Sequence, residues 1–196
     1  HAAAAVALDP DKHPWRYAEH VAACGDETDA ADAWLAAAPA LYAAGRLFRL
    51  KAALDRAAEC LADVDPTDRR WDRVRLFRVR YAMYGRKNVD ATRALLWENQ
   101  ALPQTPHRVA LGLLMELWLA TIDLGPSGAM AYAQRSIAAT PLGSELYGDV
   151  QQMSARLCLR VGERDRALSQ ALDLSRHETP RWRATGFLIA GDVCSD

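Results

Sequence analysis

The sequence predicts an all-α protein, arranged as a right-handed α-solenoid of antiparallel helical hairpins with about ten helices. Its 196 residues include 38 Ala and 25 Leu but only 10 Val and 3 Ile, and this excess of helix formers over β-branched residues argues against a sheet. Hydrophobic residues make up 51% of the chain, which is enough for a core. Because so much of the apolar content is Ala, we expect paired helices to approach closely over small side chains.

Short breaks led by Gly or Pro separate the predicted helices. A Gly closes one helix and a Pro-containing break closes the next, which is typical of helical hairpins because Gly adopts a left-handed turn conformation and Pro stops a helix. From Gly45 onward the turn glycines are spaced by 40, 40 and 37 residues, which indicates a repeat. The predicted helices, each with the break that ends it, are 14–24 (Gly25-Asp26), 28–44 (Gly45), 47–62 (Asp65-Pro66), 69–84 (Gly85), 88–101 (103–106), 106–124 (Gly125-Pro126), 128–139 (140–143), 144–161 (Gly162), 164–176 (Thr179-Pro180) and 180–190 (Gly191-Asp192).

This repeat resembles the tetratricopeptide repeat (TPR). Trp34 precedes Gly45 by 11 residues, which is the Trp-to-Gly spacing of that family, and Ala57 falls on the family's small position in the second helix. Ala167 and Ala171 fall on the corresponding small positions of the last full unit. The periods are longer than the 34 residues of the family, so the match is to a degenerate, TPR-like repeat. The resemblance implies stacked helical pairs with a concave binding groove.

The start of the chain resembles the repeat arm of the signal-transduction ATPases with numerous domains (STAND ATPases), which include the large ATP-binding LuxR-type regulators. The likeness rests on ArgTyrAlaGluHisValAlaAlaCysGlyAsp at 16–26 and on the Ala-rich helix that follows. In that family similar helices lead from an ATPase part into TPR-like repeats. The resemblance implies that residues 14–192 are a TPR-like domain from a larger bacterial regulator of signalling or transcription.

The bulk properties set further limits. A net charge of −1 gives no overall reason to expect nucleic acid or an anionic membrane as a partner. No apolar run reaches the roughly 18 residues of a membrane span. The start, HisAlaAlaAlaAla, lacks the features of a signal peptide, so residues 1–13 are interpreted as a tag or linker segment. The four cysteines have no CxxC spacing, so we expect free thiols and a cytoplasmic location.

The predicted helix at 69–84 opens the most basic part of the chain, since residues 69–108 carry 10 basic and 3 acidic side chains. Trp71, Arg75 and Arg78 share a face outside two apolar stripes, from which they could hold a carboxylate or phosphate. The alternative is a solvated face or ion pairs with the acidic segments nearby. The TPR resemblance adds first-helix residues that line the groove in that family, although its Lys/Asn clamp for a carboxylate is not reproduced. The ligand-binding candidates are Trp71, Arg75, Arg78, Met115, Gln152 and Arg156.

Other candidate sites have simpler explanations. The Asp-rich segment 26–32 superficially resembles a magnesium motif of helical isoprenoid enzymes, but acidic residues at a helix start are explained by capping and by the helix dipole. His13 and His20 have no third ligand and make a poor metal site. The sequence contains no nucleophile elbow, no recognisable Cys/His pair and no phosphate-binding loop with Lys. We therefore predict no catalytic residue, no metal and no cofactor.

The sequence thus favours a non-catalytic interaction or effector-sensing module that binds a peptide, a protein domain or a small effector. The neighbouring ATPase or output domains of a parent chain would be further partners, and neither direct nucleic-acid binding nor a membrane is expected. The alternatives are a free-standing TPR adaptor and, less favoured, an all-helical metal-dependent enzyme.

Overall fold

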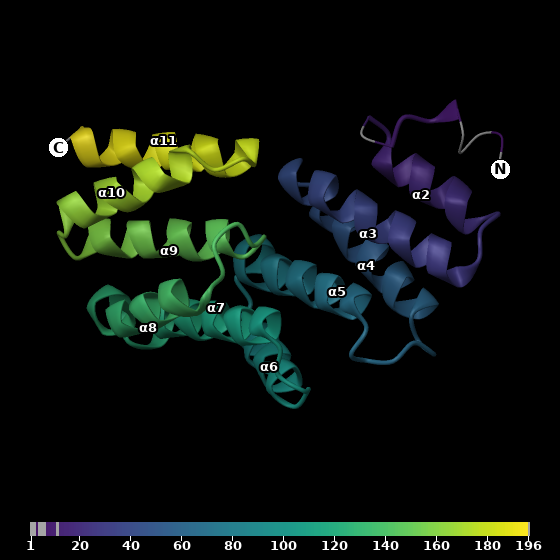
Figure 1. The fold of residues 1–196 in the computed structure, drawn as a ribbon, viewed down its shortest axis with the longest axis horizontal. Coiled ribbons are helices and arrows are strands. Elements are labelled where there is room, and N and C mark those ends of the chain that lie inside the picture. Colours follow the sequence, from purple (N-terminus) through teal and green to yellow (C-terminus); the bar gives the residue numbers. More distant parts are fainter. Residues whose placement is uncertain (1–2, 4–6, 11, 196) are drawn as a thin grey trace. The chain divides into compact units, whose positions relative to one another are not determined.

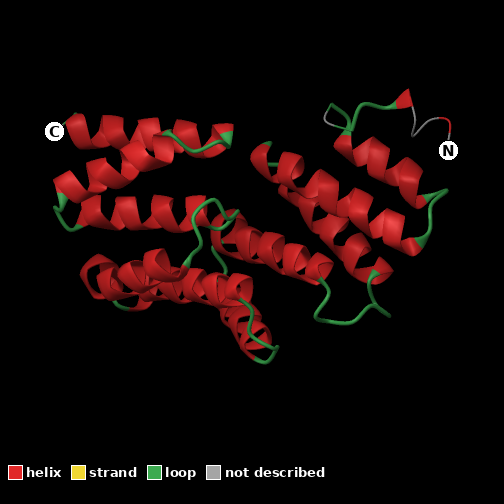
Figure 2. Cartoon of the chain, viewed as in Figure 1, coloured by secondary structure: helices red, strands yellow, loops and turns green. Residues whose placement is uncertain are grey.

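The computed structural model describes residues 3, 7–10 and 12–195 of the chain. These residues form helices and loops and contain no strand (Figures 1 and 2), so the predicted all-α class is confirmed. The chain divides into two compact units, His1–Ala91 and Thr92–Asp196, each with its own packing. Part of the predicted tag or linker segment, residues 1–2, 4–6 and 11, lies outside the described residues.

The first unit is built on successive helices that pack on one another. α2 contacts α3, α3 contacts α4, and α5 contacts both α3 and α4. The aromatic and aliphatic side chains of Trp34, Leu35, Leu50 and Phe77 lie at the centre of this core. The elements are α2 (Pro14–Ala22), α3 (Glu27–Ala43), α4 (Leu47–Cys60), α5 (Arg69–Arg80), the π-helical turn η1 (Tyr81–Arg86) and the start of α6 (Val89–Gln100).

Aspartates fix the start of two of these helices. The Asp26 carboxylate accepts a hydrogen bond from the Asp29 backbone N–H at 2.8 Å and caps α3. The Asp68 carboxylate caps α5 in the same way, accepting from the Arg70 N–H at 2.8 Å. The sequence-based explanation of the Asp-rich segment as a helix cap is therefore confirmed at Asp26.

In the second unit, α7 packs against α8, α9 against α10 and α10 against α11, and these pairs lie side by side in Figure 1. Two glycines allow neighbouring helices of this unit to approach closely. A Cβ on Gly186 of α11 would lie 2.6 Å from the Ala171 carbonyl oxygen of α10, and one on Gly148 of α9 would clash with the Trp182 ring. The remaining elements are α7 (Pro106–Asp123), α8 (Gly125–Ala139), α9 (Tyr147–Arg160), α10 (Arg164–Ser175) and α11 (Pro180–Cys194).

Two turns, one in each unit, share the same geometry. Gly45, between α3 and α4, has φ 66°, and Gly162, between α9 and α10, has φ 86°. The next residue in each turn donates its N–H to a carbonyl four residues before the glycine: Arg46 to Leu41 and Glu163 to Cys158, both at 2.9 Å. Each glycine also donates to the carbonyl three residues before it. This pairing is the Schellman motif, which ends a helix on a left-handed glycine.

Buried residues follow these two glycines at matching distances. The small residues predicted at the close approaches, Ala57, Ala167 and Ala171, are all fully buried. The buried positions five, eight, nine and twelve residues after each glycine are Leu50, Ala53, Leu54 and Ala57 in α4, and Ala167, Gln170, Ala171 and Leu174 in α10.

The prediction is wrong at Gly85 and at the end of the chain. Gly85 has no positive φ; it lies inside η1, and Lys87 takes the left-handed conformation instead with φ 51°. A Cβ on Gly85 would lie 3.1 Å from the Leu47 side chain, so this glycine serves a close approach to α4. The break predicted at Gly191 is also wrong, because α11 continues through it to Cys194.

No helix of the described chain is long and apolar enough to span a membrane.

Candidate functional site

An open hollow of about 430 Å³ lies in the first unit where the loop after α4 meets α5. Two of the six predicted ligand-binding residues, Trp71 and Arg75, line it. They are one helical turn apart on α5, so the same face presents both. The hollow, which we call the α4–α5 hollow, is lined by Ala62, Asp63, Val64, Asp65, Pro66, Trp71 and Arg75.

Local hydrogen bonds give the loop of this hollow its shape. The Asp65 carboxylate accepts from the Thr67 backbone N–H at 2.7 Å and from the Thr67 hydroxyl at 2.6 Å, as in an Asx turn. The Trp71 indole N–H donates to the Val64 carbonyl at 3.3 Å, which holds the half-buried ring against the loop. The hollow is therefore a formed feature of the α4–α5 connection.

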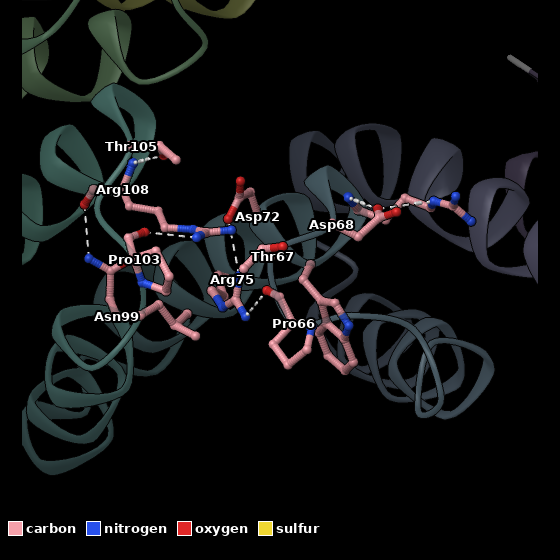
Figure 3. A network of polar contacts seen from close by, with 12 residues as sticks. Pro66, Thr67, Asp68, Asp72, Arg75, Asn99, Pro103, Thr105 and Arg108 are labelled. Carbon is pink, nitrogen blue, oxygen red and sulfur yellow. Dashed lines mark hydrogen bonds and ion pairs between the residues drawn. The ribbon is translucent and has the colours of Figure 1, made fainter.

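Arg75 has partners inside the protein (Figure 3). Its guanidinium donates to the Asp72 carboxylate at 3.0 Å and to the Pro66 carbonyl at 2.9 Å, and lies 5.9 Å from the centre of the Trp71 ring. Asp63 and Asp65 also line the hollow. The ion pair and these two carboxylates make the hollow unfavourable for an anion, so the structure does not support the expected carboxylate or phosphate on Arg75. Arg75 instead ties the loop to α5.

The other predicted residues do not line this hollow. Arg78 is half-buried further along α5. In the second unit, Gln152 is half-buried and Arg156 is exposed, both on α9. Met115 of α7 has an exposed fraction of 0%, so its side chain offers no surface to a ligand, and its assignment to a binding groove is corrected to a place in the core. The common groove implied by the TPR resemblance stays a prediction.

A second hollow, of about 250 Å³, was missed by the sequence reasoning. It lies in the first unit where the starts of α2 and α4 meet. We call it the basic hollow; it is lined by Lys12, His13, Pro14, Trp15, Arg16, Arg46 and Arg49. The sequence shows three basic or titratable side chains within residues 12–16 and two arginines one helical turn apart, at 46 and 49. The two groups come together only through tertiary packing, which the sequence pattern does not reveal.

A third hollow, in the second unit, lies over α7 and α8 and measures about 490 Å³. Its charged groups are paired with each other or with neighbours. Arg135 lies 3.5 Å from Glu116, and Asp123 lies 3.0 Å from Arg93. Mixed and paired charges give this hollow no preference for one class of ligand.

Buried polar groups near α7 serve the structure of the second unit. Arg108 is buried; its guanidinium donates to the Pro103 carbonyl at 2.9 Å, and its own carbonyl accepts from the Asn99 amide at 2.8 Å (Figure 3). The Thr105 hydroxyl caps α7 by accepting from the Arg108 N–H. These contacts brace the loop between α6 and α7.

All four cysteines are free, as expected. Burial raises the pKa of the Cys158 thiol and of the Cys60 thiol, which makes both less reactive at neutral pH. Among the described residues, no three His, Cys, Asp or Glu side chains are placed to hold a metal ion.

Comparisons with protein-family models, with curated proteins and with solved structures find no match to the chain. The resemblances to TPR repeats and to the repeat arm of STAND ATPases therefore stay sequence-based predictions.

Proposed function

We propose that the chain is a non-catalytic recognition module of TPR-like kind, whose helical pairs stack as a right-handed solenoid in a cytoplasmic regulator of signalling or transcription. The observation that carries the proposal is the repetition of one structural unit. The Schellman turns at Gly45 and Gly162, with buried positions at the same distances after each, support two copies of a helix–glycine–helix unit. Repeats of this kind present extended binding surfaces and touch only their neighbours.

The proposed ligand is a peptide segment of a partner protein, bound in the α4–α5 hollow. Val64, Pro66 and the Trp71 ring provide apolar contacts, and Asp63 and Asp65 add negative charge. An apolar side chain next to a Lys or Arg complements this surface. Tryptophan is also one of the residue types enriched among those that dominate the binding energy of an interface.

A phage-displayed peptide library panned on the full chain tests this function. We expect enrichment of a consensus with an apolar residue beside a basic one. Trp71→Ala should weaken binding of the enriched peptide by about tenfold or more, because an anchoring aromatic contributes roughly 2 kcal/mol or more.

The matched control is Trp97→Ala, which removes another Trp whose side chain is 71% exposed and lies in no described hollow. It should leave peptide binding unchanged. The proposal fails if no peptide is enriched, or if Trp71→Ala and Trp97→Ala reduce binding equally.

A further inference from the structure

We infer that the basic hollow at the starts of α2 and α4 binds the phosphate group of a small molecule. This site differs from the α4–α5 hollow, with which it shares no lining residue. The inference therefore does not depend on the proposed peptide function.

The lining of the hollow is strongly cationic. Four cationic side chains, Lys12, Arg16, Arg46 and Arg49, line the hollow together with His13, and none of the described carboxylates lines it. Lys12 pairs with Asp9 at 3.3 Å. Among the described residues, the three arginines form no ion pair. Bringing like charges together is unfavourable, and a bound dianion would offset this repulsion while accepting several charge-assisted hydrogen bonds.

The polarity of the two helices at the hollow adds to its positive charge. The N-termini of α2 and α4 meet at the hollow, and neither is capped by a side chain or has an acidic residue in its first turn. Two other described helices of this unit, α3 and α5, have the aspartate caps Asp26 and Asp68. A helix N-terminus carries a partial positive charge and binds phosphate readily. The uncapped N-termini of α2 and α4 therefore add partial positive charge beside the cationic side chains of the hollow.

Contacts with aromatic rings hold one of the arginines in place before a ligand binds. The Arg49 guanidinium lies 5.7 Å from the centre of the Trp15 ring, and that ring packs 5.1 Å from Trp34 of the core. Arg56 lies over both rings, at 5.3 Å and 4.8 Å. Because Arg49 rests on a ring that is itself anchored, less side-chain entropy is lost when it binds a ligand. Arginine also matches a phosphate with two parallel hydrogen bonds.

The size of the hollow limits the ligand. Its volume of about 250 Å³ is below the roughly 300–1,000 Å³ of sites for drug-sized molecules. A phosphate group with a small substituent fits these dimensions. Pro14 and Trp15 are the two apolar side chains in the lining.

Isothermal titration calorimetry with pyrophosphate, at constant ionic strength set by chloride, tests the site on the full chain. We expect saturable one-site binding. Arg16→Gln combined with Arg46→Gln should raise the Kd by at least about tenfold, because each arginine contributes a charge-assisted contact. Both side chains are exposed, so the variant should keep its helical circular dichroism.

The control is Arg160→Gln combined with Arg183→Gln, which removes the same charge from exposed positions in the second unit. It should bind pyrophosphate as the unmodified chain does. Absence of saturable binding, or equal weakening in both double variants, would overturn the inference, since the second result means a general charge effect.

Discussion

Gly45 and Gly162 occupy equivalent positions in two turns of the same geometry, each with a left-handed backbone and each followed by a residue that bonds back across the helix end. Neither would meet another atom within 4 Å if it carried a Cβ. Their requirement for glycine is therefore conformational and not steric. The two turns are the clearest structural sign of a repeat in this chain.

Gly45→Ala is expected to lower the free energy of unfolding by about 1–2 kcal/mol, because alanine is strained at positive φ. Urea unfolding followed by circular dichroism measures the loss. Gly45→Asn is the control: asparagine tolerates the left-handed region better, so its loss should be smaller. Equal losses for Ala and Asn would show that backbone strain is not the cause.

Gly186→Ala is expected to destabilise the second unit by roughly 1–3 kcal/mol, since the new methyl group would press on the backbone of α10 at Ala171 and Ser175. Gly191→Ala is a matched control on the same helix, where a Cβ meets nothing within 4 Å. It should stabilise by about 0.5–1 kcal/mol through better helix propensity. Thermal unfolding separates the two variants; a shift in the same direction for both would contradict the packing of α10 on α11.

Asp26→Ala is expected to cost about 1 kcal/mol of stability, because it removes the hydrogen bond that caps α3. Asp32→Ala, at an exposed position in the middle of α3, should change stability by less than about 0.5 kcal/mol. Both values come from denaturant titrations, repeated with magnesium. A magnesium-dependent stabilisation that Asp26→Ala abolishes would contradict the capping role and favour a metal site.

The contribution of Cys158 to stability should fall at high pH. Burial raises the pKa of this thiol in the folded protein, so the unfolded chain ionises first. The stabilisation is complete below the unfolded pKa of about 8.5 and is lost as pH rises toward the folded value. The stability difference between the unmodified chain and Cys158→Ala should shrink from pH 7 to pH 10 in urea titrations. An unchanged difference would contradict the burial of the thiol.

The helix boundaries were largely predictable because their signals are local. α7 begins at Pro106 as predicted, and α10 begins at Arg164 directly after the turn at Gly162. Gly85 misled the prediction because its role is tertiary: it makes room for Leu47 of another helix, and no local signal distinguishes that from a turn. Gly191 misled it for a different reason, since neighbouring helical residues override one poor helix former.

The candidate sites were predictable only where one helix supplies the residues. Trp71 and Arg75 lie together because they are one turn apart on α5, and Arg75 is held by Asp72 of the same helix and by the Pro66 carbonyl of the loop. The sequence offered ion pairing only as the alternative to ligand binding. Met115 was misplaced because the groove pattern of a family was applied to a helix that is buried on more than one side. The basic hollow could not be read from sequence, because Arg16 and Arg46 meet through packing of α2, α3 and α4.

The central claim is that a peptide binds the α4–α5 hollow of a non-catalytic module. The most direct test is titration of the ¹⁵N-labelled full chain with the enriched peptide, followed by backbone amide chemical shifts. We predict shifts concentrated between residues 61 and 75, with those of Val64 and Trp71 among the largest. Shifts confined to other helices, or no shifts at saturating peptide, would contradict the claim.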